Sequence, residues 1–247
     1  MKKFLVLILL LTALICTAEP LLWRIDGETP SYIFGTIHYP DPKVTPLPDL
    51  VTAKLDSVDT YVMEAVMDES AMGVILQYVM LDSLTLDKIL PADLYKKCDS
   101  LLGTMGQSIA MYTTMKPWML SLTFSMPPQM AEMTETPMDL YLMNAASERK
   151  MKVEGLETVE DQIKLFDDQP FEDQIKSLEK AVSEYSNYQD MLTDIIDVYA
   201  NGDVEELHDK VNFYNTDKDE RKFIEKILYE RNTTMHEGIV ERLEAEN

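Results

Sequence analysis

Four short segments of the chain have the composition of β-strands, and they constrain the fold more than any other feature. They are rich in apolar, aromatic and β-branched residues, and they cover residues 21–25, 31–37, 60–66 and 150–157. The first two flank the turn-forming sequence Asp26-Gly27-Glu28-Thr29-Pro30, which predicts a β-hairpin. Four strands in a chain of 247 residues predict a small sheet, so most of the core must come from helices.

Most of the remaining chain is expected to be helical. A short helix is predicted over residues 49–56, and the segment of about 70–147 forms a helical insertion that is broken by several prolines. After Thr158 the apolar residues recur at helical spacing. The helices predicted there cover residues 162–166, 171–200, 204–211 and 218–245. We therefore predict an α/β fold in which a small mixed sheet carries a helical insertion and a helical C-terminal half.

Residues 1–18 are expected to be a secretory signal peptide. A basic pair at 2–3 precedes an apolar run over 4–16, and Thr17-Ala18 supplies the small residues of a cleavage site. The run is too short for a comfortable transmembrane helix. Cleavage after Ala18 predicts a secreted, periplasmic or otherwise extracytoplasmic domain over 19–247 without a stable membrane span. A lipoprotein acylated at Cys16 and an uncleaved anchor are the alternatives.

The charge of the chain restricts its partners. The sequence has 22 basic and 44 acidic residues, a formal net charge of −22. Such a chain repels phosphate backbones, which excludes nucleic-acid binding, and anionic membrane surfaces are disfavoured for the same reason. Loss of Cys16 with the signal would leave Cys98 as the single cysteine, so no disulfide staples the predicted domain.

Three of the predicted strands end in side chains that can carry chemistry: His38, Glu64 and Glu157. If these strands lie parallel in one sheet, their carboxyl ends share an edge and the three side chains converge. One imidazole and two carboxylates can hold a divalent cation, or one glutamate can act as general base on a bound water. Glu154 competes with Glu157, but strand alternation places it on the opposite face. Taken singly, a Gly-x-x-His is also typical of a structural histidine, and a strand-end glutamate of a solvated charge.

The helical insertion is rich in methionine, with nine between Met105 and Met143. Methionine suits adaptable apolar grooves, so these helices are a candidate site for an apolar ligand. The alternative is a core: Met111, Met115 and Met119 recur at the helical i, i+4 spacing, which is typical of a buried stripe.

Several sequence blocks, taken in order, resemble the TraB/GumN family. They are Leu22-Trp23-Arg24-Ile25, Tyr32-Ile33-Phe34-Gly35-Thr36-Ile37-His38, Leu47-Pro48, Tyr61-Val62-Met63-Glu64, Pro137-Met138-Asp139-Leu140, Gly155-Leu156-Glu157-Thr158 with Gln162, and Glu230-Arg231-Asn232 with Met235. The blocks span nearly all of the chain after the signal, and together they are far more specific than any one of them.

The resemblance implies a fold and an activity. The family is similar to the TIKI metalloproteases, and more remotely to the erythromycin-esterase and haem-binding ChaN-like proteins, on an α/β fold with helical insertions. TIKI-type members are secreted or membrane-tethered and use Mn²⁺ or Co²⁺, rather than Zn²⁺, to hydrolyse peptides. Their metal motif is a pair of Gly-x-x-His sequences plus a glutamate. On this chain the resemblance implies metal ligation by His38 and Glu64, a ligand or general-base role for Glu157, and stabilisation of developing charge by Arg231.

One part of the family pattern is missing. The second Gly-x-x-His is expected on a strand after the helix that contains Arg231, and the sequence ends at Asn247 without it. His208 lies in an acidic helical segment and is predicted to be a surface residue, which leaves His236 as the other candidate. We therefore expect an exported, metal-dependent hydrolase of a peptide or small-molecule ester with an incomplete site. The alternatives are a non-catalytic ligand- or haem-binding protein and an inactive, truncated family member.

Overall fold

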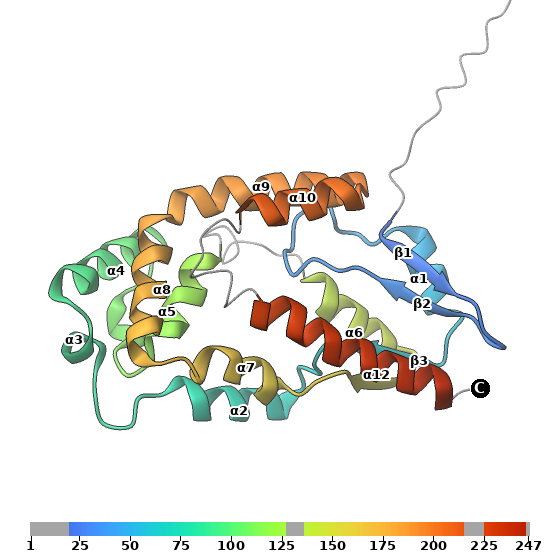
Figure 1. Cartoon of the computed structure of the whole chain (residues 1–247), viewed down its shortest axis with the longest axis horizontal. Helices are drawn as coiled ribbons and strands as arrows, with labels where there is room; N and C mark the ends of the chain where they lie inside the picture. Colours follow the sequence, from blue (N-terminus) through green and yellow to red (C-terminus); the bar gives the residue numbers. More distant parts are fainter. Residues whose placement is uncertain (1–19, 127–135, 215–224, 246–247) are drawn as a thin grey trace, which may run out of the picture.

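A β-hairpin stands at one end of the long axis of the molecule, and a group of helices stands at the other end (Figure 1). The computed structural model describes residues 20–126, 136–214 and 225–245. The hairpin consists of β1, Leu22–Ile25, and β2, Ser31–Phe34, which pair antiparallel with Trp23 opposite Ile33. The predicted hairpin is therefore confirmed, although its second strand ends three residues earlier than expected.

The second strand pair is parallel, and its two strands are separated in the sequence by the helical insertion. It joins β3, Thr60–Met63, to β4, Lys152–Gly155, with Met63 opposite Gly155. Within the described residues, β2 does not pair with β3, so the four strands form two two-stranded sheets. The α/β fold is confirmed, and the one expected sheet is divided in two.

Helices occupy the chain between these strands. Helix α1, Asp49–Leu55, follows the hairpin and begins directly after Pro48. The helices between β3 and β4 are α2, Glu69–Val79; α3, Leu86–Ile89; α4, Ala92–Thr104; a 3₁₀ turn, Ile109–Tyr112; α5, Pro117–Ser125; and α6, Met138–Glu148. They occupy the predicted helical insertion.

The C-terminal part is helical, as predicted. Its elements are α7, Val159–Asp167; α8, Phe171–Ser183; α9, Tyr185–Asn201; α10, Val204–Tyr214; the π-helix η3, Glu225–Glu230; and α12, Arg231–Ala245. The single helix expected over 171–200 is divided at Glu184, where α8 and α9 meet at a sharp bend (Figure 1). Gly202 ends α9 in the left-handed conformation at φ 72°, which a glycine adopts without strain.

Three clusters of buried side chains hold these elements together. The first joins α3, α4, α5 and α8 around Leu102, Phe124 and Leu178, all with no exposed surface. The second joins the segment after the hairpin to α1, α6 and α9, and the third joins α2, α5 and α7 around Trp118. Cys98 is a buried member of the first cluster, and burial raises the pKa of its thiol, so it behaves as a core residue.

The methionines of the insertion do not form one helical stripe. Met111 lies in the 3₁₀ turn and is 65% exposed, whereas Met119 lies in α5. Pro117 is the reason for the difference, since it begins α5 at a position where no amide proton is needed and so separates Met115 from Met119. The predicted core stripe is therefore wrong for Met111, whereas Met115 and Met119 pack against the cluster around Trp118. Met130 and Met133 lie outside the described residues.

The predicted signal peptide, residues 1–18, also lies outside the described residues. Among the helices that are described, none combines the length and the apolar character that crossing a membrane requires.

Candidate functional site

The ends of β3 and β4 bring two glutamates together. Glu64 directly follows β3, and Glu157 lies two residues beyond β4. The parallel pairing continues past the strands, because the backbone N–H of Glu157 donates to the carbonyl oxygen of Glu64 at 2.9 Å. Both residues therefore leave the same edge of the strand pair, which is the placement expected at the carboxyl ends of parallel strands.

Gly155 makes the turn after β4 possible. A Cβ atom at this position would lie 2.8 Å from the carbonyl oxygen of Glu157 and 3.4 Å from the backbone nitrogen of Val66. Both neighbours are backbone atoms, which cannot rotate away. The absence of a side chain at Gly155 thus lets the chain turn back tightly and present Glu157 beside Glu64.

Arg231 completes this group from a distant part of the chain. It is the first residue of α12 and directly follows the π-helix η3. Its Nε donates to both carboxylate oxygens of Glu157, at 3.1 and 3.2 Å. Its Nη2 donates to Oε2 of Glu64 at 2.6 Å and also to Oε1 of Glu157. One guanidinium therefore binds both carboxylates, with the bidentate geometry that makes arginine–carboxylate pairs strong.

The three side chains differ in exposure. Glu157 is 8% exposed and Arg231 18%, whereas Glu64 is 43% exposed. A carboxylate as buried as that of Glu157 needs a charged partner, and Arg231 supplies it. The hydrogen bond to Glu157 is the main cause that raises the pKa of Arg231, so the guanidinium stays charged. Glu64 is the carboxylate of the pair that solvent or a ligand can reach.

Gln162 on α7 adds a neutral partner to the two glutamates. Its Nε2 donates to Oε1 of Glu157 at 2.8 Å and lies 3.5 Å from Oε2 of Glu64. The sequence places Gln162 one helical turn after Thr158, on the helix that Glu157 leads into. Sequence reasoning included Gln162 in a family block without giving it a role, and its spacing of five residues from Glu157 was the available signal.

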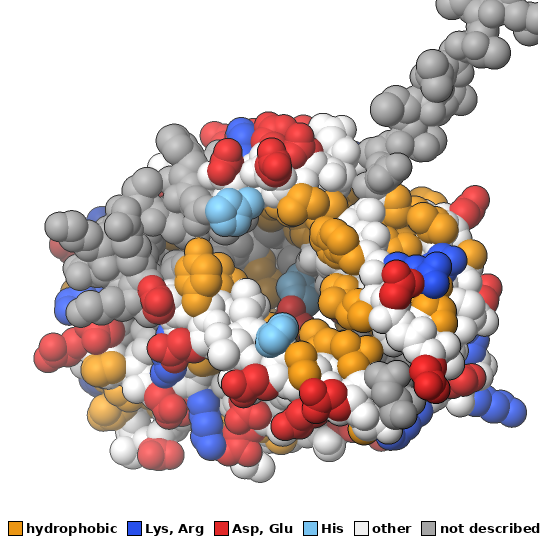
Figure 2. Space-filling view, turned by 45° about the vertical axis from the view of Figure 1, so that its right-hand side comes forward, with side chains coloured by type: hydrophobic (Ala, Val, Ile, Leu, Met, Phe, Trp, Pro, Cys, Tyr) orange, Lys and Arg blue, Asp and Glu red, His pale blue; other side chains and the backbone are white. Residues whose placement is uncertain are grey.

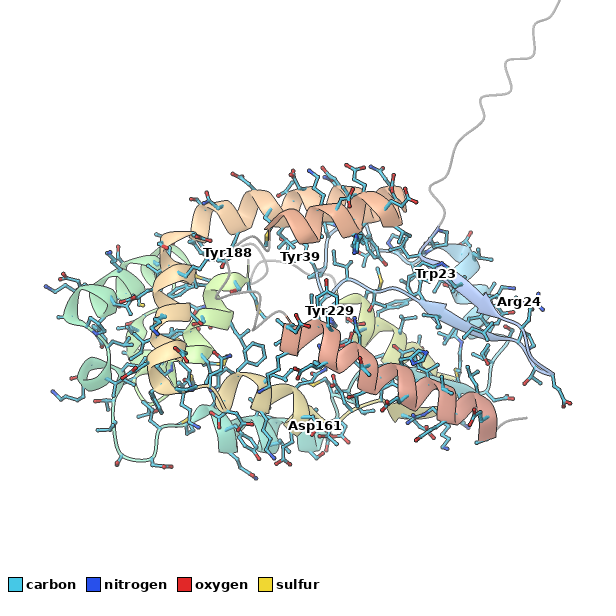
Figure 3. All side chains as sticks on the ribbon, in the orientation of Figure 1. Trp23, Arg24, Tyr39, Asp161, Tyr188 and Tyr229 are labelled. Carbon is cyan, nitrogen blue, oxygen red and sulfur yellow. The ribbon has the colours of Figure 1, made fainter. Side chains whose placement is uncertain are left out.

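The start of α7 fixes the direction in which the chain leaves Glu157. Thr158 caps the helix: its Oγ1 accepts from the backbone N–H of Asp161 at 3.1 Å, and the Asp161 carboxylate accepts from the backbone N–H of Thr158 at 3.0 Å. Asp161, labelled in Figure 3, lies on the first turn of the helix. This reciprocal capping box stabilises the helix immediately beside the site.

We expect Thr158→Ala to lower the free energy of unfolding by about 1 kcal/mol, the usual cost of losing such a cap. The hydrogen bond from the Thr158 hydroxyl is the main cause that holds the pKa of Asp161 below its ordinary value of 3.8. The pKa of the Asp161 carboxyl is lower in the folded state than in the unfolded state, so its ionised form stabilises the folded protein at every pH above the unfolded-state pKa. This stabilisation is lost as the pH falls through the folded-state pKa.

The loss in the free energy of unfolding caused by Thr158→Ala should therefore be smaller at acidic pH than at neutral pH. Urea unfolding of both proteins at about pH 7 and about pH 2.5 measures this. A deficit of the same size at both pH values would contradict a role for the ionised Asp161 carboxylate.

Glu154 lies apart from this group, as strand alternation predicts. It pairs with Lys152 and accepts from Nε of Arg242 at 3.0 Å. Arg242 also donates to the carbonyl oxygen of Gly155 at 3.0 Å. The structure therefore gives Glu154 a partner on α12 at a different position from Arg231 and leaves Glu157 as the glutamate beside Glu64.

His38 reaches the site by another route than the one predicted. Its strand was expected to share a sheet edge with β3, but β2 ends at Phe34 and belongs to the separate hairpin sheet. The chain leaves the hairpin ladder after Gly35, whose N–H still donates to the carbonyl oxygen of Leu21 at 2.8 Å. The prediction that the strand before His38 joins one parallel sheet with β3 and β4 is therefore wrong. The side chain of His38 nevertheless lies close enough to Glu64 and Arg231 for their charges to act on it.

The charges that act on His38 link it to Glu64 and Arg231. A hydrogen bond to Asp139 is the main cause that raises the pKa of His38, and partial burial opposes it. The negative charge of Glu64 raises this pKa further, and the positive charge of Arg231 lowers it. The charges of Glu64 and Arg231 therefore both act on the imidazole of His38.

Asp139 is a site residue that sequence reasoning missed. It lies on the first turn of α6, and its Oδ2 contacts Nδ1 of His38. Burial opposes its ionisation, but hydrogen bonds from His38 and Thr36 outweigh burial, so the pKa of Asp139 lies below its ordinary value. The signal was the block Pro137-Met138-Asp139-Leu140, in which the aspartate is the one charged residue.

A divalent cation needs several donor atoms around it, and the site supplies some of them. His38 and Glu64 offer an imidazole nitrogen and a solvent-accessible carboxylate, and Figure 2 shows histidine side chains in and around a hollow with hydrophobic side chains along one rim. Within the described part of the chain, no group of three His, Cys, Asp or Glu side chains is placed to hold a metal ion. His208 and His236 are both exposed. His38 and Glu64 carry donor atoms of types that divalent cations accept, but the described residues place no third such side chain beside them.

The described methionines of the insertion do not form one set. Met115 and Met119 pack against the cluster around Trp118, Met138 is buried in the cluster that joins α1, α6 and α9, and Met126 is exposed. A groove of about 830 Å³ between α4 and α8 has no methionine among its lining residues. The described methionines thus serve several parts of the core, and no observation favours a haem or apolar ligand among them.

Fold and site together define an α/β protein with an acidic cluster at the carboxyl edge of a short parallel strand pair, closed by an arginine. The family model of the TraB/PrgY/gumN family matches residues 21–247, and the chain belongs to this family. Comparisons with curated proteins and with solved structures found no match.

Proposed function

We propose that this chain is an exported, metal-dependent hydrolase that cleaves a peptide or ester bond, with His38 and Glu64 as the protein's metal ligands. The observation that carries the proposal is the convergence of an available imidazole, an accessible carboxylate and a charged guanidinium from three separate elements. Family membership supports it, because the resemblance implies Mn²⁺ or Co²⁺ chemistry at these positions. Two protein ligands make the site incomplete, so we expect weak metal binding.

Each residue then has a distinct task. The chemistry that a bound cation supplies at such a site is Lewis-acid activation of water or of a carbonyl oxygen. Both glutamates contact Arg231, but Glu64 is 43% exposed and can accept a proton or a metal ion, whereas Glu157 is 8% exposed and is also held by Gln162. We therefore assign Glu157 to holding Arg231 in place, in preference to acting as the general base. Arg231 places a fixed positive charge where a substrate oxyanion develops.

Metal binding by the full chain tests the proposal. We expect Mn²⁺ or Co²⁺ to raise the thermal midpoint of unfolding, because a ligand that binds only the folded state stabilises it by about 2.7 kcal/mol at 100 times its Kd. His38→Ala should abolish the shift. His208→Ala, which removes an exposed histidine on α10, should retain it.

Hydrolysis is tested with the same three proteins. A panel of peptides and chromogenic esters, assayed with and without Mn²⁺ or Co²⁺, should show metal-dependent turnover by the wild type and the His208→Ala variant. Turnover should be lost in the His38→Ala variant. The absence of any thermal shift with Mn²⁺, Co²⁺ and Zn²⁺ would refute the metal site.

A further inference from the structure

Helix α2 has apolar side chains on two sides, and only one of these sides is covered. The helix lies along the lower edge of the molecule, next to α7 (Figure 1). Val74 and Ile75 pack against the cluster around Trp118. Met72 and Leu76 lie one turn apart on the other side of the helix and are 61% and 51% exposed. Because a helix that is apolar on all sides is normally buried, the exposed side of α2 indicates a binding surface.

The exposed apolar side chains form a row along the helix. Met80, at the C-terminal cap of α2, comes one turn after Leu76 and is also exposed. A Cβ atom at Gly73, on the same side, would meet nothing within 4 Å. We call Met72, Leu76 and Met80 the α2 stripe. Single exposed apolar residues are ordinary, but a row of large ones is typical of an interaction surface.

The α2 stripe belongs to a helix that is fixed at both ends. Asp68 caps the first turn, where its Oδ1 accepts from two backbone N–H groups at 2.8 and 3.3 Å. At the other end the backbone N–H of Lys116 donates to the carbonyl oxygen of Val79 at 2.8 Å, and Met80 forms a β-bridge with Met115. A partner therefore meets a preformed surface and does not have to order it.

Acidic residues flank the α2 stripe at both ends. Asp68 and Glu69 precede it, Asp82 follows it, and all three are exposed. The sequence contains no lysine or arginine between Lys54 and Lys88. An apolar stripe with acidic ends is complementary to an apolar stripe with basic ends.

The charges disfavour two other occupants of the α2 stripe. A second copy of this chain brings the same acidic ends and a net charge of −22, so repulsion opposes its approach. Helices that lie on a membrane surface carry lysine and arginine beside their apolar side, and α2 has neither. Lys164 of α7 lies 5.9 Å from the ring centre of Tyr78 on α2, but it pairs with Glu160. A basic partner is therefore the occupant that the charges favour.

We propose that the α2 stripe binds an amphipathic helix of a partner protein, one with large apolar residues along one side and lysine or arginine at both ends. Binding of an amphipathic helix through its apolar side is a recurring mode of peptide recognition, and exposed methionines suit it because their side chains adapt to the partner. Since α2 has 11 residues and a helix rises about 1.5 Å per residue, the partner helix needs about three turns. This binding is separate from the proposed hydrolysis.

Designed peptides test the proposal. The probe is a fluorescein-labelled helix of about 14 residues, with leucine along one side, lysine at both ends and glutamine elsewhere. It is titrated with the full chain without added metal, so that binding is measured apart from metal-dependent hydrolysis. We expect the probe to bind. A scrambled peptide of the same composition, which has no apolar side, and a peptide with glutamate in place of lysine should bind at least about tenfold more weakly.

Variants of the α2 stripe locate the binding. Met72→Gln and Leu76→Gln should each weaken binding of the probe about tenfold or more, the effect of removing an apolar anchor from an interface. Leu50→Gln is the matched control, because Leu50 is a leucine of α1 that is 50% exposed, and it should leave the affinity unchanged. Glutamine is a good helix former, so all three variants should keep the circular dichroism and the thermal midpoint of the wild type.

Several results would overturn the proposal. They are the absence of binding by the probe, equal binding of the scrambled peptide, and binding that neither Met72→Gln nor Leu76→Gln weakens. Analytical ultracentrifugation that shows a dimer of the chain alone, dissociated by Leu76→Gln, would assign the α2 stripe to a second copy. Cosedimentation with vesicles of phosphatidylcholine, or of phosphatidylcholine and phosphatidylglycerol, that is lost in the same variant would assign it to a membrane surface.

Discussion

Arg231→Ala is expected to lower the free energy of unfolding by about 3–5 kcal/mol, the range measured when one partner of a buried ion pair is removed. The variant leaves Glu157, 8% exposed, without the guanidinium that neutralises it. Gln162 remains as a hydrogen-bond donor, but it carries no charge. Glu64 contributes less to the loss because it is 43% exposed and solvent replaces its partner. Urea unfolding measures the effect as a fall in the midpoint at an unchanged slope.

Arg242→Ala is the matched control on the same helix. Arg242 pairs with Glu154, which keeps Lys152 as a second cation when the guanidinium is removed. Arg242 also donates to the carbonyl oxygen of Gly155, so we expect a loss of about 1 kcal/mol, smaller than that of Arg231→Ala. Losses of the same size in the two variants would show that truncation of α12 side chains, and not the charge of Glu157, determines the effect.

Gly155→Ala is expected to lower the free energy of unfolding by about 1–3 kcal/mol, the cost of forcing extra atoms into a filled space. The new Cβ would lie 2.8 Å from the Glu157 carbonyl oxygen and 3.5 Å from Cα of Ala65. Because both are backbone atoms, the turn itself must open. Opening it displaces Glu157 from Arg231, so metal-dependent turnover should fall together with stability.

Gly73→Ala makes the same chemical change with the opposite expected sign. Gly73 lies inside α2, and a Cβ atom there meets nothing within 4 Å. Alanine should stabilise this helix by about 0.5–1 kcal/mol, because glycine loses more conformational freedom on folding. Thermal midpoints that move in opposite directions support the steric role of Gly155; a Gly155→Ala midpoint that equals or exceeds the wild type contradicts it.

Local patterns predicted the elements well and their partners less well. The hairpin, the strands that lead to Glu64 and Glu157, and the helical C-terminal half follow from apolar periodicity and turn residues. The helix expected over 171–200 is two helices, because periodicity continues across the bend at Glu184 and does not reveal a change of direction. The single sheet was wrong for a similar reason: strand composition does not specify which strands pair.

The same limit applies to the candidate site. Glu64 and Glu157 were found because parallel strands end at one edge, which is a rule of local geometry. Arg231 entered only through the family resemblance, since its place on a charged helix gives no sign of a partner 167 residues away. Asp139 has the ordinary appearance of a first-turn acid, and only the packing of α6 against the segment 35–38 distinguishes it from Asp93, the exposed first-turn acid of α4.

The link between Arg231 and Glu64 has a consequence for the order in which this molecule becomes organised. Closing a loop costs entropy that rises with the number of residues it contains, and contacts between distant residues slow folding for this reason. The hydrogen bonds of α8 or α9 need only neighbours along the chain, whereas the guanidinium must find its carboxylates across most of the sequence. Each helix can thus exist before the charge cluster does. The proposed chemistry belongs to no single segment, and it is present only while His38 and Arg231 are held near the glutamates that follow β3 and β4.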